Sequence, residues 1–192
     1  MQKVGNNHAR GFTIVELLIV IVIIGILAAL IIVAYNGIQQ RATNTSTVST
    51  VAAYAKAMIN YKNINGVFPT SPACLGTGYG NGLSGNESTN VNGQCQSWND
   101  IKESTTFNNQ VSPYLNGSLP SPPMTTTIGD GTDTTWFRGI HYNNYSGFGG
   151  YYLGFVILGS SSCPSISGLT NTGQTTGSFS GGRYCLLPFA DQ

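Results

Sequence analysis

The sequence predicts an α+β fold, in which a long N-terminal α-helix packs on a small antiparallel β-sheet head. Three observations carry this prediction. The chain opens with a long apolar run, continues with a mild apolar stripe at helical spacing, and ends with aromatic and β-branched runs that are typical of strands. A chain of 192 residues leaves room for one modest domain after the apolar run.

The apolar run covers residues 12–34 and contains a single charge, Glu16. A helix needs about 20 apolar residues to cross the hydrocarbon of a bilayer, and in lipid it satisfies all of its own backbone groups. We therefore expect residues 12–34 to span a membrane. A cleavable signal peptide is the alternative, but its apolar region has only about 7–15 residues.

Glu16 is the exception that points to a function, because a carboxylate in lipid is costly and usually has a definite partner. It lies in the stretch RGFTIVELL, residues 10–18. This stretch resembles the processing and assembly motif of the type IV pilin superfamily, which includes the pseudopilins. Gly11 matches the last leader residue, Phe12 the first mature residue and Glu16 the fifth. The resemblance covers residues 10–41 and is architectural beyond them.

The resemblance implies a maturation pathway. Residues 1–11 would be a basic leader, prepilin peptidase would cut between Gly11 and Phe12, and the Phe12 amine would be methylated. An assembly platform and its ATPase would then move subunits from the membrane into a homo-oligomeric helical filament. Glu16 would pair with the Phe12 amine of a neighbouring subunit. Pairing with its own amine or with the helix dipole are the alternatives.

The helix is expected to continue beyond the membrane to residue 64. An apolar stripe with spacings of three and four residues follows the run, formed by Ile38, Ala42, Thr45, Val48, Ala52, Ala55 and Ile59. Residues 63–66 (NING) read as a helix stop. A helix over residues 12–63 would be about 78 Å long, which suits a filament subunit. Gly25 and Gly37 are the places where it could bend, and Val33 stands where many pilins carry Pro.

Residues 65–192 are expected to form an extracytoplasmic head. Residues 65–132 are rich in Gly, Ser and Pro and read as a loop region with one short helix over residues 98–102. Residues 133–192 hold three predicted strands, 134–142, 151–158 and 183–189, the first two joined as a hairpin with a long turn.

Four cysteines follow the apolar run: Cys74, Cys95, Cys163 and Cys185. They allow three connectivities. We favour Cys74–Cys95 and Cys163–Cys185, since each closes a short polar loop that buries little apolar surface and would gain about 2–4 kcal/mol from the bond. Free buried cysteines are the alternative. Disulfides would indicate an oxidising compartment.

Few residues indicate a site for nucleic acid, a metal ion or a dinucleotide. The head's Lys and Arg are scattered, and the net charge is +1, so we expect no specific nucleic-acid partner. Asp130 and Asp133 are candidate Ca²⁺ ligands, but two carboxylates are too few for a complete shell and a plain turn is preferred. Residues 80–85 match G-x-G-x-x-G without the flanking strand and helix that a dinucleotide site requires.

We expect no enzymatic activity and no cofactor. His141, the one histidine after the leader, reads as a partly exposed strand residue, and no G-x-S-x-G occurs. Aromatic residues gather in one region, where sheet packing is preferred to glycan binding: Tyr142, Tyr145, Phe148, Tyr151 and Tyr152. Asn-x-Ser/Thr triplets begin at four places, as chance predicts in so polar a chain: Asn44, Asn86, Asn116 and Asn144.

Three functions from different classes fit these observations. The favoured one is a subunit of a type IV pilus for adhesion, twitching motility or DNA uptake, held in the cell membrane with its head outside before assembly at the cell surface. The alternative is a pseudopilin of a type II secretion-like or competence machine. The third is a signal-anchored surface protein, which an uncut N-terminus would indicate.

Overall fold

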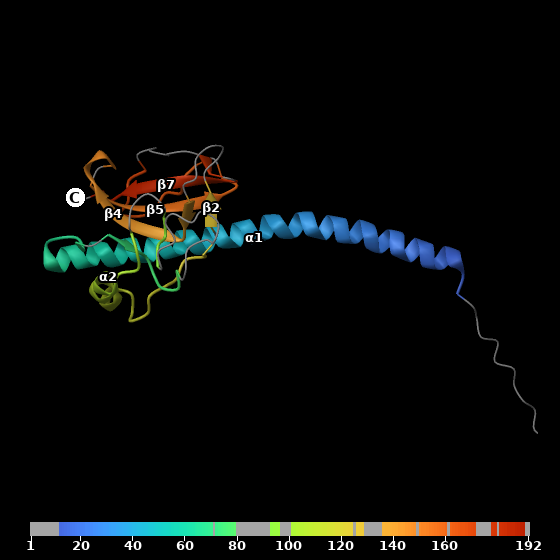
Figure 1. The fold of residues 1–192 in the computed structure, drawn as a ribbon, viewed down its shortest axis with the longest axis horizontal. Helices are drawn as coiled ribbons and strands as arrows, with labels where there is room; N and C mark the ends of the chain where they lie inside the picture. Colours follow the sequence, from blue (N-terminus) through green and yellow to red (C-terminus); the bar gives the residue numbers. More distant parts are fainter. Residues whose placement is uncertain are drawn as a thin grey trace, which may run out of the picture. The chain divides into compact units, whose positions relative to one another are not determined.

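A computed structural model describes residues 12–70, 72–79, 93–96, 101–124, 126–128, 136–148, 150–160, 162–171, 178–179 and 181–190. The chain divides into two compact units, one up to Gln39 and the other from Gln40 onward. A 52-residue helix, α1 (Ile14–Asn65), runs through both units (Figure 1). The α+β fold predicted from the sequence is confirmed.

The observed bounds of α1 lie within two residues of the predicted ones. The helix is continuous through Gly25 and Gly37, and bending at these glycines in a filament stays a prediction. Its C-terminal end has the geometry that the sequence indicates: Gly66 has φ 77°, and its N–H donates to the carbonyl of Lys62 at 2.7 Å.

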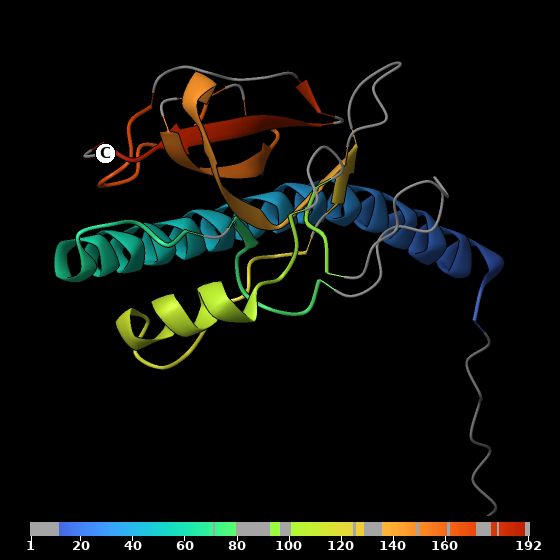
Figure 2. The ribbon, with the colours of Figure 1, turned by 60° about the vertical axis from the view of Figure 1, so that its left-hand side comes forward.

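The second unit is built around a five-stranded antiparallel sheet in the order β1-β4-β5-β7-β6. Its strands are β1 (Ala73–Cys74), β4 (Ile140–Tyr145), β5 (Gly150–Leu158), β6 (Ser178–Phe179) and β7 (Gly182–Pro188). The sheet lies on one side of α1, and α2 (Thr105–Val111) lies on the other (Figures 1 and 2). The short helices η1 (Ser112–Tyr114) and η2 (Ser146–Phe148) follow α2 and β4.

Both faces of the central strands are covered. On the face toward α1, residues such as Leu153, Phe155 and Leu187 join Val51 and Met58 of the helix in one core. On the opposite face a second cluster is formed by Phe137, Tyr152, Tyr184 and Leu186, with Val156 packed against it. Because every second side chain is buried on each face, β5 and β7 read as nearly continuous apolar runs rather than alternating ones.

The predicted strand over residues 134–142 was wrong in its extent. The structure has β3 (Trp136–Arg138) and β4, separated at Gly139, which has φ 69°. β3 pairs with β2 (Thr126–Ile128) in a separate two-stranded sheet. A side chain at residue 139 would strike Tyr79, since a Cβ there would lie 2.6 Å from its hydroxyl oxygen.

Residues 98–100 of the short helix predicted over residues 98–102 lie outside the described residues, and residues 101 and 102 are not helical. Lys102 and Glu103 form isolated bridges with Gln94 and Cys74. The helix α2 begins at Thr105, which the sequence did not predict, and is capped by Ser104, whose hydroxyl accepts the N–H of Phe107 at 3.2 Å.

His141 is buried, with 1% of its surface exposed, and not partly exposed as predicted. Its ring stacks with Phe137 and Tyr184 and meets Tyr152 edge-on. Its Nε2 shares a 3.0 Å hydrogen bond with the Tyr184 hydroxyl. Gly154 leaves the room for this ring, because a Cβ at residue 154 would overlap it. Burial lowers the pKa of His141 to about 3, so the imidazole is neutral.

Asn44 joins α1 to the end of β5. Its Nδ2 donates to the carbonyl of Leu158 at 2.8 Å, and its Oδ1 accepts the N–H of Leu158 at 2.9 Å. The side-chain amide thus pairs with the strand as a backbone amide of a neighbouring strand would. Because the amide nitrogen of Asn44 donates this hydrogen bond, it is not free in the glycosylation triplet that begins at Asn44.

We predict that Asn44→Ala lowers the free energy of unfolding by about 1–3 kcal/mol, because both polar groups of Leu158 lose their partner. Guanidinium unfolding followed by near-ultraviolet circular dichroism measures this. The control is Ser46→Ala on the same helix, an exposed site that should change stability by less than about 0.5 kcal/mol. Equal stability of Asn44→Ala and the wild type would show that the amide pair does not stabilise the junction.

We predict that acid destabilises the head through His141. The unfolded chain binds a proton near the ordinary pKa of 6.5 and the folded chain only near 3, so stability falls as the pH falls between these values. At about 1.4 kcal/mol per pH unit, the loss at pH 5 is roughly 2 kcal/mol. His141→Phe lacks this proton, and its unfolding free energy should stay nearly constant from pH 7 to 5. An equal decline in both proteins would assign the effect to other groups.

Candidate assembly site

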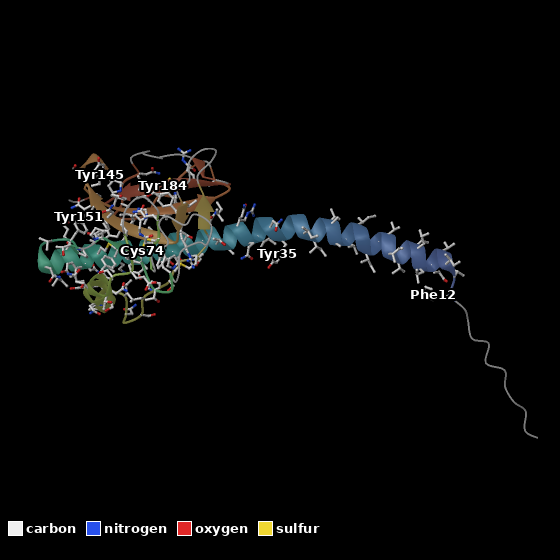
Figure 3. All side chains as sticks on the ribbon, viewed as in Figure 1. Phe12, Tyr35, Cys74, Tyr145, Tyr151 and Tyr184 are labelled. Carbon is white, nitrogen blue, oxygen red and sulfur yellow. A yellow bond between two sulfur atoms is a disulfide. The ribbon has the colours of Figure 1, made fainter. Side chains whose placement is uncertain are left out.

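The first part of α1 is a wholly exposed apolar helix. Residues 12–32 are all exposed, and the exposed fraction of their large hydrophobic residues runs from 85% at Ile14 to 47% at Val20. Among the described residues, α1 is the one helix long and apolar enough to cross a membrane, with a mean hydropathy of 3.6 in its most apolar window. Figure 3 shows Phe12 at the start of this segment. No residue of this segment is buried by the part of the chain that the structure describes.

Glu16 and Thr13 form a reciprocal cap at the start of α1. Glu16 Oε2 accepts the N–H of Thr13 at 2.8 Å and its hydroxyl at 2.7 Å, and the Thr13 hydroxyl oxygen accepts the N–H of Glu16 at 3.2 Å. This is a capping box, in which two otherwise unpaired backbone donors are satisfied. The signal in the sequence is T-x-x-E before an apolar run, and sequence reasoning missed Thr13.

The cap uses one of the two carboxylate oxygens of Glu16. Within the described residues Oε1 accepts no hydrogen bond, so it is open to a donor from outside the chain. The structure therefore supplies a carboxylate that its own helix holds in place and that retains an acceptor toward the surroundings.

The other sequence-predicted residues stand apart from this cap. Gly11 and the leader lie outside the described residues, as do Asp130, Asp133 and residues 80–85. A Cβ at Gly25 or Gly37 would meet no described atom within 4 Å apart from the adjacent residues and the nearby backbone of the helix itself. No group of three His, Cys, Asp or Glu side chains that could hold a metal ion occurs in the described parts of the chain.

The structure pairs Cys74 with Cys95 and Cys163 with Cys185, the connectivity that the sequence favours.

The backbone of Tyr79, which lies between Cys74 and Cys95 in the sequence, is bound by two side chains of opposite charge. Its N–H donates to Glu103 Oε1 at 2.6 Å, and its carbonyl accepts from Arg138 Nη1 at 2.6 Å.

The aromatic residues near the hairpin of β4 and β5 mostly pack against the sheet. Tyr142 and Tyr151 stack with ring centroids 5.6 Å apart, and Tyr152 lies in the outer cluster. Tyr145 is 57% exposed at the end of β4, as Figure 3 shows. Packing therefore accounts for three of these rings.

Comparison with known proteins gives one family model, which lies at the N-terminal end of the chain, and several curated relatives. A family model described as "Prokaryotic N-terminal methylation motif" matches residues 6–32. Type II secretion system core protein G of Escherichia coli K12 is 40% identical over 66 residues, 34% of this chain and 46% of that protein. The protein of the same name from Dickeya chrysanthemi is 37% identical over 71 residues, 37% of this chain and 46% of that protein.

A pilin is also among the relatives. Type IV major pilin protein PilE of Neisseria gonorrhoeae is 31% identical over 80 residues, 42% of this chain and 48% of that protein. The chain thus spans about half the length of the curated relatives it matches. No solved structure matches it significantly.

The methylation motif places Phe12 and Glu16 at the start of an exposed apolar helix. The second half of that helix packs on a small antiparallel sheet, and a secretion core protein and a pilin are among the relatives. In these features the chain resembles the type IV pilins and pseudopilins.

Proposed function

We propose that the chain is a structural, non-enzymatic subunit that polymerises through α1 into a helical filament, and that the filament is the pseudopilus of a type II secretion-like machine. The observation that carries the proposal is the uncovered apolar surface of residues 12–32, headed by Glu16. The choice of machine rests on the relatives, which include core protein G of several bacteria. They favour the pseudopilin over the surface pilus that the sequence favoured.

The apolar surface has two successive environments in this proposal. In the membrane, lipid covers residues 12–32, and in the filament the same side chains pack against neighbouring subunits. Apolar burial is thus kept rather than newly gained, so the transfer between the two states needs little hydrophobic driving force. Polar groups within the segment then decide which register neighbouring helices adopt.

Glu16 is the polar group that sets this register. Prepilin peptidase would cut between Gly11 and Phe12 and leave an amine next to Thr13. While the subunit is in lipid, Thr13 satisfies one oxygen of Glu16. On assembly, the Phe12 amine of a neighbouring subunit donates to the other oxygen, because a charged partner lowers the cost of a carboxylate in an apolar surrounding.

The further partners follow from the superfamily: prepilin peptidase, an assembly platform and its ATPase. The head lies outside the cytoplasm, which agrees with the two disulfides. A surface pilus for adhesion, motility or DNA uptake is the second candidate, supported by the match to a major pilin over 80 residues.

We predict that Glu16→Ala leaves cleavage before Phe12 intact and lowers filament yield about tenfold, as a loss of roughly 1.4 kcal/mol per contact would. Glu16→Gln keeps the cap, since Gln also serves in a capping box, but loses the charge, and its yield should fall equally. Gln39→Ala, exposed on the same helix, is the control. The intact mass of each protein shows whether it starts at Phe12, and sheared filaments give the yield.

Normal filaments from Glu16→Ala would remove the register role of this residue. Normal filaments from Glu16→Gln alone would assign the role to the cap rather than to the charge. A precursor that still carries residues 1–11 in the wild type would contradict the maturation pathway and favour an anchored surface protein.

We predict that removal of the gene stops export of one or more folded proteins into the medium and leaves long surface filaments unchanged, because a pseudopilus serves a secretion machine. The measurements are comparison of culture supernatants and electron microscopy of cells, each with the gene restored as a control. Loss of long filaments with unchanged export would instead select the surface pilus.

A further inference from the structure

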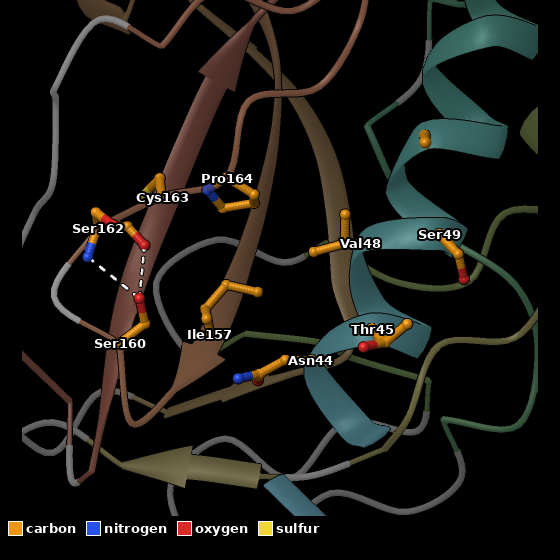
Figure 4. A pocket seen from close by; sticks show the side chains of 10 residues that line it. Asn44, Thr45, Val48, Ser49, Ile157, Ser160, Ser162, Cys163 and Pro164 are labelled. Carbon is orange, nitrogen blue, oxygen red and sulfur yellow. Dashed lines mark hydrogen bonds between the residues drawn. The ribbon is translucent and has the colours of Figure 1, made fainter. Parts of the chain in front are cut away.

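A groove of about 500 Å³ opens in the head between α1 and the segment that follows β5 (Figure 4). Its inner surface is apolar, with Val48 and Ala52 from α1, Ile157 from β5, and Pro164. Hydroxyl groups such as that of Thr45 lie at its margin. None of the ten described residues that line the groove carries a charge, so its occupant should be apolar and uncharged.

The walls of the groove are held in place without an occupant. Asn44 fixes α1 to Leu158 on one side. On the other side the Ser160 hydroxyl donates to the carbonyl of Ser162 at 2.9 Å and accepts its N–H at 3.3 Å, as the dashed lines in Figure 4 show. Cys163 is bonded to Cys185 of β7. The groove is therefore preformed, which favours binding because little ordering is needed.

The C-terminal end of α1 carries an apolar projection of the same character. We call residues 64–67 the tip. Ile64 is 72% exposed and Val67 is 57% exposed, and among the side chains after Gln40 whose burial the structure describes, Tyr145 is the one other large hydrophobic group that is exposed. The turn is fixed by the Gly66–Lys62 hydrogen bond, and Phe68 at its base is buried under the Lys62 ammonium, 4.9 Å from the ring centroid. No residue of the tip is charged.

We propose that the tip of one copy seats in the groove of the next copy, so that heads stack end to end. The inference rests on the proposed filament. Val48 and Ile64 are 16 residues apart on one helix, about 24 Å at ~1.5 Å per residue, so tip and groove occupy different ends of the head. A contact between two different patches of identical subunits is heterologous, and when it does not close into a ring it continues as an open filament.

The N-terminal helix of another copy is the rival occupant of the groove. The groove follows α1 only over residues 44–52, about 12 Å along the helix axis, whereas residues 12–32 extend about 30 Å. The groove would cover only a small part of that helix. Two aliphatic side chains on a tight turn match its extent better.

The test is cysteine cross-linking in filaments of the full-length protein, with Ile64→Cys and Ala52→Cys in the same chain. These positions are about 18 Å apart on one helix, too far for a bond within a copy, which needs Cα atoms 4.4–6.8 Å apart. Mild oxidation should therefore give a ladder of dimers, trimers and larger species on non-reducing gels. The control pairs Ile64→Cys with Ser46→Cys, which is exposed on α1 outside the groove, and should give about tenfold less.

Each other outcome overturns the inference in a distinguishable way. Filaments of the double variant without a ladder would exclude the tip-to-groove contact and leave the proposed function standing. A bond from Ala52→Cys to Ile24→Cys, but not to Ile64→Cys, would assign the groove to the N-terminal helix. Absence of filaments from the wild type would remove the proposed function together with the inference.

Discussion

The head depends on the burial of one face of α1 against the sheet. Val51, Tyr54, Ala55 and Met58 are all fully buried on that face, and they make most of the helical contribution to the core. Strands β5 and β7 bring their apolar side chains to the same core. The small Ala55 allows the sheet to approach α1 closely, so that the large aromatic rings of the strands fill the remaining space. Without this contact the sheet would have one uncovered face.

The same helix meets opposite demands in its two halves. Over residues 12–32 its side chains are apolar on every side apart from Thr13 and Glu16, and none of these residues is buried by the described parts of the chain, whereas in the second unit α1 buries one face only. A helix that is apolar all round needs lipid or other proteins around it. The Thr13–Glu16 cap lets this segment hold a carboxylate without leaving it unpaired, since the first turn of a helix has backbone donors that lack partners. The first half of α1 is thus available for assembly, and the second half stabilises the fold of the head.

Features set by neighbouring residues could be predicted from the sequence. The apolar run and the Gly66 stop gave the bounds of α1 to within two residues, and β5 and β7 follow from their apolar runs. The Thr13–Glu16 cap is also local, and its motif was available. The prediction did not include this cap, because it assigned Glu16 a partner in a neighbouring subunit.

Features set by contacts far apart in the chain could not be predicted. The division between β3 and β4 depends on Tyr79, whose hydroxyl bonds the N–H of Ile140 61 residues away. His141 is buried because Phe137 and Tyr184 cover it from other strands. α2 lacks a long apolar repeat, and it is fixed by Phe107 and Val111 reaching the core. Nothing in its local sequence marks Asn44 as the partner of Leu158.

The position of the two disulfides bears on how this protein can diversify. Cys74 and Cys185 are fully buried members of β1 and β7, so each polar stretch between paired cysteines is tied covalently to the interior. Doubling the length of such a stretch costs only about 0.6 kcal/mol in closure entropy. Insertions between the cysteines that leave buried residues such as Tyr79 and Tyr184 in place can therefore accumulate at little cost to the fold. The same property would let foreign peptides be carried there on a filament for display.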